Sequence, residues 1–175
     1  EHFSAFNSYN YPALARAGVH ITYDRQQIRP IGNIARPLHV FNRFDTRVAI
    51  LKLFPGITEE VVAAILNIPD LRGVVLETFG AGNAPSHEWL YERLRAAVER
   101  GVVIVNKTQC NTGSVSMGQY AVSLNLLKAG VISGYDITTE ALLTKMMHVL
   151  GEYGEDLVKV KKMLSVSLCG ELTNV

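Results

Sequence analysis

The clearest candidate for chemistry in this sequence is a glycine-rich turn, residues 80–85, that follows a β-branched apolar run. Its two glycines, Gly80 and Gly82, let the backbone bend tightly and approach a ligand. Asn83 follows them with a side-chain amide that both donates and accepts hydrogen bonds. A helical pattern begins at Ser86, and the free N–H groups of a helix start favour a carboxylate or phosphate. The turn is interpreted either as a ligand loop or as an ordinary strand-to-helix connection.

A second candidate is the stretch 107–114, which is dense in hydroxyl and amide side chains. A hydroxyl nucleophile needs a base nearby. Lys107 is next to Thr108 in sequence, but side chains alternate along an extended chain, so Lys107 points the other way. Cys110 has no histidine or helix start clearly placed to activate its thiol. We therefore expect a turn with satisfied hydroxyls and a packed small residue at Cys110, and we assign no catalytic residue to this chain.

Other polar residues offer weaker signals. Glu77 stands at the end of a central apolar run, where a charge is costly unless it is paired or solvated, so we expect a salt-bridged carboxylate rather than a general base. The turn at 80–82 lacks the third glycine of the dinucleotide fingerprint, which argues against NAD. The two cysteines and five histidines show no metal-ligand spacing. We therefore expect neither a cofactor nor a metal.

The elements that must position these loops alternate between strands and helices from residue 47 onward. Apolar runs beginning at Val48, Val74 and Val102 are typical of buried strands. Each pair of runs encloses one helical pattern, which is the rhythm of right-handed βαβ units in a parallel sheet. Further elements are expected in this order: a helix over 120–128, a short strand within 130–134, and helices over 138–150 and 156–168. The prediction is an α/β fold, a parallel sheet of about four strands flanked by helices in three layers.

Residues 1–46 depart from this pattern. A segment from Ala13 to Ala17 that ends at Gly18 is predicted to be a short helix. Residues 19–23 alternate like an edge strand, and a further short strand is expected over 38–41. Between them, residues 24–37 carry Arg, Gln, Pro and Gly without a period, which is typical of a linker. This part is predicted to be an extension that does not belong to the α/β domain.

Composition excludes several classes of function. A length of 175 residues, with 48% hydrophobic and 19% charged residues, suits one globular domain of ordinary size. The net charge of +1 and the lack of a basic run argue against binding to nucleic acid or to an acidic membrane. The longest apolar stretches are strand-sized, so no membrane span is expected. Two thiols in a chain of this length suggest a reducing compartment.

Several motifs occur together in an order that resembles the C-terminal domain of L-asparaginases. The motifs are Glu77-Thr-Phe-Gly-Ala-Gly-Asn-Ala-Pro85, Glu99-Arg-Gly-Val-Val-Ile-Val-Asn106, Thr108-Gln-Cys110, Ala129-Gly-Val-Ile-Ser-Gly134, Thr139-Glu-Ala141 and Gly170-Glu-Leu-Thr173. The sequence looks most similar to the cytoplasmic type I branch, and the resemblance runs over nearly the whole chain. It is far more specific than a lone Gly-x-Gly pattern.

The resemblance implies a two-domain parent enzyme that hydrolyses L-asparagine to L-aspartate and ammonia. In that family the N-terminal domain carries the nucleophilic threonine in a glycine-rich turn, and a second threonine followed by aspartate, with a lysine. None of those motifs occurs here. Residues 1–46 then correspond to the tail of the N-terminal domain plus the interdomain linker, and 47–175 to the C-terminal domain. The isolated chain is expected to be inactive.

The family's active sites form at the interface of an intimate dimer. The implied partners are therefore the chain's own N-terminal domain and a neighbouring identical subunit, with L-asparagine as the small-molecule substrate. The asparagine of the Gly-x-Gly-Asn loop reaches the amino-acid end of the substrate, which points to Gly82 and Asn83 as substrate-binding residues. Type II members add a glutamate after the third strand, but this chain has no acidic residue between 106 and 134. A tyrosine substitutes in type I relatives, which points to Tyr120.

The resemblance also suggests an effector site and leaves alternatives open. Some type I enzymes bind effector asparagine near the Thr-Gln-Cys stretch, so Thr108 and Cys110 are candidate effector-site residues. Relatives with that behaviour carry arginine where this chain has Glu77, so the resemblance does not extend to allostery. Two other functions fit the same residues. One is an amidotransferase subunit of the same superfamily that releases ammonia for a tRNA-linked substrate, and the other is a non-catalytic ligand-binding or assembly module.

Overall fold

The chain divides into two units, residues 1–41 and 42–175. The computed structural model describes residues 10–28, 38–118 and 121–173. In the first unit, β1 (Ala15–Ala17) pairs antiparallel with β2 (Ile21–Tyr23). The edge strand predicted over 19–23 is therefore confirmed in its second half, and the helix predicted over 13–17 is wrong. Five residues are too few to repay helix nucleation, and residues 18–20 instead connect the two strands of a hairpin.

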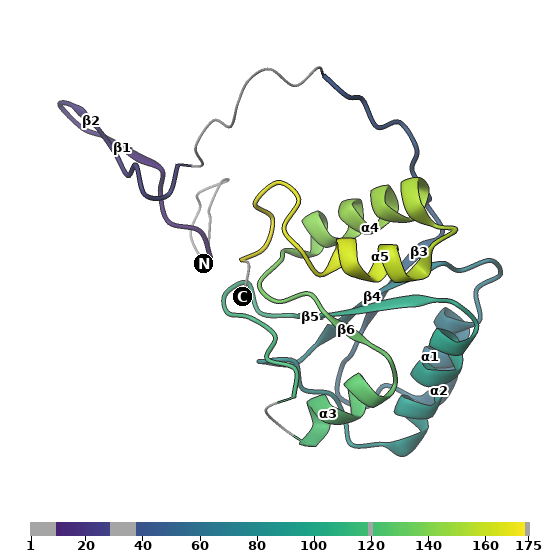
Figure 1. Cartoon of the computed structure of the whole chain (residues 1–175). Helices are drawn as coiled ribbons and strands as arrows, with labels where there is room; N and C mark the ends of the chain where they lie inside the picture. Colours follow the sequence, from purple (N-terminus) through teal and green to yellow (C-terminus); the bar gives the residue numbers. More distant parts are fainter. Residues whose placement is uncertain (1–9, 29–37, 119–120, 174–175) are drawn as a thin grey trace. The chain divides into compact units, whose positions relative to one another are not determined.

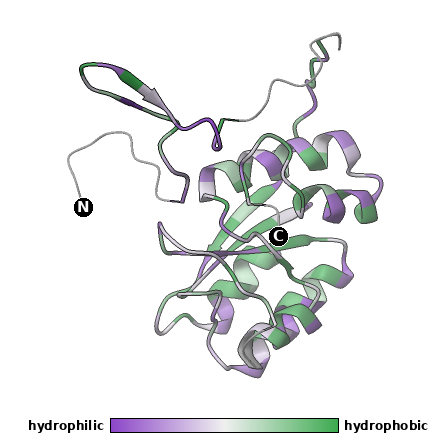
Figure 2. Cartoon of the chain, turned by 60° about the vertical axis from the view of Figure 1, so that its left-hand side comes forward, coloured by the Kyte–Doolittle hydropathy of each residue, from purple (hydrophilic) through white to green (hydrophobic). Residues whose placement is uncertain are grey.

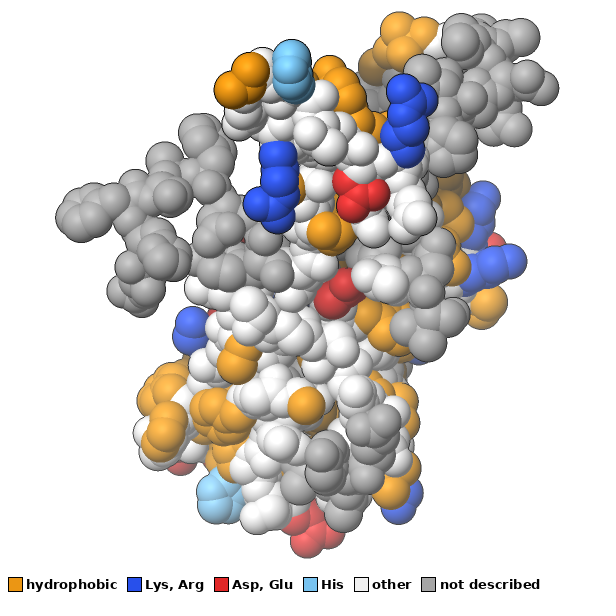
Figure 3. All heavy atoms as spheres, turned by 90° about the vertical axis from the view of Figure 1, so that its left-hand side faces the viewer, with side chains coloured by type: hydrophobic (Ala, Val, Ile, Leu, Met, Phe, Trp, Pro, Cys, Tyr) orange, Lys and Arg blue, Asp and Glu red, His pale blue; other side chains and the backbone are white. Residues whose placement is uncertain are grey.

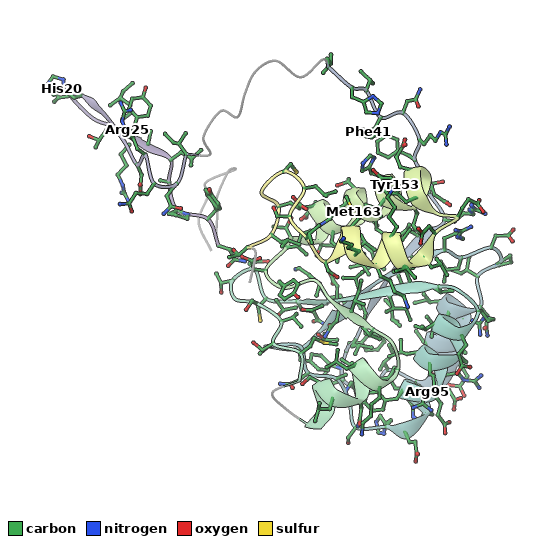
Figure 4. All side chains as sticks on the ribbon, in the orientation of Figure 1. His20, Arg25, Phe41, Arg95, Tyr153 and Met163 are labelled. Atoms are coloured by element: carbon green, nitrogen blue, oxygen red, sulfur yellow. The ribbon has the colours of Figure 1, made fainter. Side chains whose placement is uncertain are left out.

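The hairpin exposes its apolar side chains. Val19 is 97% exposed, Ile21 59% and Tyr23 57%, so neither face of the two-stranded sheet is buried within its own unit. Figure 4 shows His20 at the tip of the hairpin and Arg25 after β2. The strand predicted over 38–41 is also wrong, because these residues are exposed and have no strand partner in the described part of the first unit.

A four-stranded parallel sheet forms the centre of the second unit (Figure 1). Its strands, in spatial order, are β3 (Val48–Lys52), β4 (Gly73–Thr78), β5 (Val103–Thr108) and β6 (Ile132–Ser133). In the register of the sheet, Ile50 lies opposite Val75, and Val75 opposite Val105. Every residue of β4 and β5 is buried, which explains the apolar runs with which both strands begin; their carboxyl ends are polar and also buried. The predicted α/β fold is confirmed.

Helices cover both faces of this sheet (Figure 1). One face carries α1 (Glu59–Leu66), α2 (Glu88–Glu99) and α3 (Ala121–Lys128), and the other carries α4 (Thr139–Tyr153) and α5 (Leu157–Leu164). Neighbouring residues of β5 enter different cores, because side chains alternate along a strand: Ile104 packs on the α1–α3 side and Val105 on the α4–α5 side. Figure 4 shows Arg95 on α2, away from Tyr153 and Met163 on the opposite layer. In Figure 2 the helices are green toward the sheet and purple outward.

Several helix boundaries differ from the predicted ones. The helix after the glycine-rich turn begins after His87, not after Ser86, and neither residue's side chain caps it. The last helix, α5, ends at Leu164 and not at Leu168. At α4 the predicted start is confirmed, because the Thr138 hydroxyl caps the helix by accepting a hydrogen bond from the Ala141 N–H at 3.3 Å; the helix continues to Tyr153, beyond the predicted residue 150.

The C-terminal segment, residues 165–173, is fastened to α4 and α5 by a buried ion pair. The predicted helix end at Leu168 is wrong, because Lys145 Nζ donates to the carbonyls of Leu164 (3.2 Å) and Val166 (2.6 Å) and takes the chain off the helical path. Lys145 Nζ also lies 2.6 Å from Glu171 Oε1, with side chains 4% and 8% exposed. The Leu168 N–H donates to the same carboxylate at 2.9 Å.

The strand order of this sheet follows the chain order. The crossover helices α1, α2 and α3 all lie on one face, so the connections between the described strands never diverge to opposite faces. Open α/β sheets bind ligands in the crevice where connections diverge, and this arrangement lacks one. A ligand at the carboxyl edge of this sheet would therefore not be enclosed between diverging connections. As for membranes, the helices within the described residues lack the combination of length and apolar character that a span requires.

Candidate substrate-binding loop

The glycine-rich loop, residues 79–83, is a closed turn at the carboxyl end of β4. The Phe79 N–H donates to the Asn83 carbonyl at 2.8 Å, and the Asn83 N–H donates back to the Phe79 carbonyl at 2.7 Å. Gly82 has φ +105°, a conformation that favours glycine. A Cβ at this position would lie 2.8 Å from Val115 Cγ1. The turn is therefore fixed by its own backbone and requires glycine at position 82.

Asn106 lies beneath the turn, fully buried near the end of β5. Its Oδ1 accepts a hydrogen bond from Thr78 Oγ1 at 2.6 Å. Its Nδ2 lies within hydrogen-bonding distance of the Gly82 carbonyl (3.5 Å) and of Met117 Sδ (3.3 Å). No role for Asn106 is predicted from the sequence. Its burial could have been predicted, because side chains alternate along a strand and Asn106 therefore lies on the same face of β5 as Ile104, which packs on the α1–α3 side.

Contacts on either side also hold the loop. The Ser116 N–H donates to the Ala81 carbonyl at 3.1 Å. Downstream, the Tyr91 hydroxyl donates to the Pro85 carbonyl at 2.9 Å. Burial raises the pKa of the Tyr91 hydroxyl, which keeps it protonated as a donor. The turn is thus tied to β5, to α2 and to the chain that precedes α3.

Asn83 is exposed, in contrast to Gly82 beneath it. Its backbone is hydrogen-bonded on both sides, yet its side-chain amide forms no hydrogen bond with another residue that the structure describes. Uncharged polar and backbone atoms, drawn white, predominate in the lower part of Figure 3. The two residues predicted to bind substrate therefore have different positions: Gly82 supports the turn, and Asn83 presents an amide to solvent.

The predicted effector residues, Thr108 and Cys110, differ in exposure. Thr108 is 2% exposed, and its Oγ1 accepts a hydrogen bond from the Cys110 N–H at 3.0 Å. Cys110 is exposed, so the prediction of a packed residue there is wrong: β5 runs through Thr108, and the chain leaves the sheet before Cys110. Tyr120, the remaining predicted site residue, lies outside the described residues.

Both carboxylate oxygens of Glu77 contact residues of the same domain. Its side chain is 9% exposed, with Oε2 3.4 Å from Lys52 Nζ. Its Oε1 accepts a hydrogen bond from Thr139 Oγ1 at 2.6 Å. This geometry confirms the salt-bridged strand-end carboxylate expected from the sequence. Within the described residues, no three His, Cys, Asp or Glu side chains are grouped so that they could hold a metal ion.

A groove of about 630 Å³ lies next to the loop's support rather than at Asn83. It is lined by Ser114, Val115, Ser116, Met117, Leu127, Val131, Ile132, Ser133, Tyr135 and Ser165. No residue of the turn 79–83 belongs to this lining. The amide of Asn83 therefore projects from the edge of the sheet and does not line that groove.

Comparison with known proteins identifies the source of this architecture. The family model described as the glutaminase/asparaginase C-terminal domain matches residues 47–164. The human 60 kDa lysophospholipase is 44% identical over 171 residues, which cover 98% of this chain and 29% of that protein. L-asparaginase 1 of Escherichia coli is 38% identical over 98% of this chain and 49% of its own length. The crystal structure of L-asparaginase I from Vibrio cholerae superposes with a TM-score of 0.87 at 38% identity, over 98% of this chain and 51% of the other.

The chain therefore spans about half the length of the bacterial asparaginases that it matches, and less than a third of the human protein. The family model covers more than half of the chain, over the residues that form the parallel sheet and its helices. The chain belongs to the asparaginase family, and residues 47–164 form its glutaminase/asparaginase C-terminal domain.

Proposed function

We propose that this chain is part of a cytoplasmic enzyme that hydrolyses L-asparagine to L-aspartate and ammonia. On this proposal residues 1–46 are the tail of an N-terminal domain plus a linker, and residues 47–175 are the C-terminal domain. The threonine nucleophile comes from the N-terminal domain. The C-terminal domain lends the loop 79–83 to an active site shared with a neighbouring identical subunit.

The observation that supports this role is that Asn83 combines a fixed backbone with an exposed side-chain amide. Its backbone is held by two hydrogen bonds of 2.7 and 2.8 Å, while its side-chain amide is exposed and makes no hydrogen bond within the described residues. A polar group on a rigid turn loses little conformational entropy when it binds a ligand. Among the described strands, the connections do not diverge to opposite faces of the sheet, so the ligand crevice typical of open α/β sheets does not form between them. Both features suit a loop that completes a site in another domain.

The chemistry of an amide suits the amino-acid end of L-asparagine. Nδ2 of Asn83 can donate to the α-carboxylate, and Oδ1 can accept from the α-ammonium group. Holding these groups in register would align the side-chain amide of the substrate with the nucleophile, which contributes to the rate without chemical participation. Asn83 is therefore proposed as a substrate-binding residue and not as a catalytic one.

The test is the substitution Asn83→Ala in the intact protein, assayed by ammonia release from L-asparagine. We expect kcat/KM to fall about ten- to a hundredfold, the loss expected for about 1–3 kcal/mol of hydrogen bonding. Asn125→Ala is the matched control, because Asn125 is an exposed asparagine on α3, and its loss should change kcat/KM by less than about twofold. Unchanged kinetics in Asn83→Ala would remove the loop from the active site.

Two further assays separate the proposal from its alternatives. Turnover by the isolated chain 1–175 would contradict the two-domain argument, since we expect none. Hydrolysis of a lysophospholipid by the intact protein, with no ammonia release from asparagine, would instead favour the activity named for the human relative. Ammonia release that depends on a partner subunit and a tRNA-linked substrate would favour an amidotransferase, and binding of asparagine by the isolated chain would favour a stand-alone module.

Two residue assignments complete the proposal. Tyr120 is proposed to take the place of the glutamate that type II enzymes use, and Tyr120→Phe tests whether its hydroxyl contributes to substrate affinity. For the candidate effector site, Cys110 is the accessible member of the pair, whereas Thr108 is buried. A Cys110→Ala variant with an unchanged dependence of rate on asparagine concentration would exclude an effector role for its thiol.

A further inference from the structure

Asn106 connects the interior of the sheet to the loop that carries Asn83. It lies between β4 and β6, in register with Leu76 on one side and Ser133 on the other. Its side chain is fully buried, and its backbone carbonyl accepts a hydrogen bond from the Gly134 N–H at 2.8 Å. A buried amide is costly unless its polar atoms are bonded, so the orientation of this side chain is set by its partners.

Those partners determine which way the amide points. The Gly82 carbonyl can only accept, so the Asn106 atom that faces it at 3.5 Å must be the Nδ2 donor. Oδ1 then faces Thr78 Oγ1 at 2.6 Å, and the threonine hydroxyl donates to it. The reversed amide would place two acceptor oxygens against each other at Gly82. Thr78 therefore holds Asn106, and Asn106 in turn holds the peptide that joins Gly82 to Asn83.

We infer that Asn106 is a positioning residue for substrate binding: through the Gly82 carbonyl it fixes where the Asn83 amide projects. This inference rests on the proposed function of Asn83. The packing at Gly82 supports it, because a Cβ there would lie 3.2 Å from Asn106 Nδ2 and 2.8 Å from Val115 Cγ1. The turn thus sits directly on these two side chains. A small displacement of the Asn106 amide is transmitted to the backbone of the turn.

The decisive variant is Asn106→Asp in the intact protein. Aspartate keeps the acceptor that faces Thr78 but replaces the donor that faces the Gly82 carbonyl with an oxygen. We expect kcat/KM for L-asparagine to fall about tenfold, the effect of one lost buried hydrogen bond. Thr78→Val is the gentler variant, because valine has nearly the same shape as threonine. It replaces with a methyl group the hydroxyl that donates to Asn106 Oδ1 and that also lies 3.3 Å from the Lys107 carbonyl. Thr78→Val should lower kcat/KM by about threefold. If Asn106→Asp does not fold, Thr78→Val still tests the same chain of contacts.

A double-mutant cycle separates positioning from general damage. In an Asn83→Ala background, Asn106→Asp should change kcat/KM by less than about twofold, because the group that it positions is gone. A merely structural role would lower kcat/KM by the same factor in both backgrounds, and that result would overturn the inference. Amide hydrogen exchange gives a second readout that does not depend on activity. The N–H groups of Gly82 and Asn83 should exchange at least about tenfold faster in Asn106→Asp, with no change at Ile57 in the neighbouring loop.

The two readouts keep this inference distinct from the proposed function. If Asn83→Ala leaves kcat/KM unchanged but exchange in the turn still accelerates in Asn106→Asp, the active-site role of Asn83 fails while Asn106 still holds the loop. If exchange at Gly82 and Asn83 stays at the wild-type rate in both Asn106→Asp and Thr78→Val, Asn106 does not position the turn. In that case the inference is wrong even when Asn83 binds substrate.

Discussion

Two irregular segments of the α/β unit, the loop 79–83 and the C-terminal segment 165–173, use their polar side chains in opposite ways. In the C-terminal segment, the Glu171 carboxylate is 8% exposed and accepts from Lys145 Nζ and from the backbone N–H of Leu168. In the loop, only the backbone is bonded, and the Asn83 amide faces solvent. The difference suggests a criterion: a polar group whose hydrogen bonds are used inside the domain serves the fold, and one left exposed on a rigid turn is available to a ligand.

The far end of the C-terminal segment follows the same rule. The N–H and the hydroxyl of Thr173 donate to the two carboxylate oxygens of Asp136, at 2.8 and 2.5 Å. Two carboxylates therefore anchor the segment to the domain: its own Glu171, which pairs with Lys145, and Asp136, which accepts from Thr173. We expect substitutions in this segment to change stability, and substitutions at Asn83 to change activity.

The largest effect is expected from Lys145→Met. Removing one partner of a buried ion pair leaves the other charge uncompensated, so the free energy of unfolding should fall by about 3–5 kcal/mol. Urea unfolding followed by circular dichroism measures it. The control is Lys162→Met, an exposed lysine on α5 whose loss should cost less than about 0.5 kcal/mol. Equal effects from the two substitutions would contradict the structural role assigned to the C-terminal segment.

A smaller effect is expected in the acid range. Burial alone would raise the pKa of Glu171, but the Lys145 ammonium and the backbone N–H groups outweigh it and hold that pKa well below its usual value of 4.5. The stabilisation is therefore fully present above pH 4.5 and is lost as the pH falls below it. Between pH 6 and pH 3, the stability advantage of the wild type over Glu171→Gln should shrink by roughly 1 kcal/mol.

The same pH series sharpens the comparison between the two segments. An amide does not titrate, so the free energy of unfolding of Asn83→Ala should change with pH in the same way as that of the wild type. The difference in unfolding free energy between the wild type and Asn83→Ala should therefore not depend on pH. If this difference shrank at low pH, as expected for Glu171→Gln, the loop would share in the electrostatic stabilisation of the fold. If Glu171→Gln kept a constant offset from the wild type, the assigned shift in the Glu171 pKa would be wrong.

Most of the parallel sheet was predictable because it depends on local patterns. The runs that begin at Val48, Val74 and Val102 are apolar on both faces, and each lies within or directly before a strand of the structure. The position of the glycine-rich loop follows from the same pattern. By contrast, a five-residue segment such as Ala13–Ala17 has too few residues to distinguish a helical period from a strand period, and that prediction failed.

What the sequence could not show depends on contacts between distant residues. Nothing near Lys145 indicates that its ammonium binds Glu171, so the early end of α5 was not foreseeable. Asn106 is a similar case, because its partners Thr78 and Gly82 belong to a different strand and loop. The buried position of Asn106 could have been predicted, because side chains alternate along β5. Its hydrogen-bond partners could not be predicted, because they depend on the register between β4 and β5.

The smallest effect is expected at Glu77. This residue tests the criterion drawn from the two segments, because its position suggests a catalytic role whereas its hydrogen bonds suggest a structural one. Glu77 lies one residue before the end of β4, close to the loop, as a catalytic carboxylate would, but Lys52 and Thr139 already contact its two oxygens. Lys52 is 62% exposed, so the ion pair is well screened, and Glu77→Gln keeps an acceptor for the Thr139 hydroxyl. The free energy of unfolding should fall by at most about 1 kcal/mol, and kcat/KM of the intact protein should stay within about twofold. A general base would instead lose about 10²–10⁴ in kcat. A loss of that size would show that a carboxylate can be fully hydrogen-bonded inside its own domain and still act on the substrate, which would break the distinction drawn between the two segments.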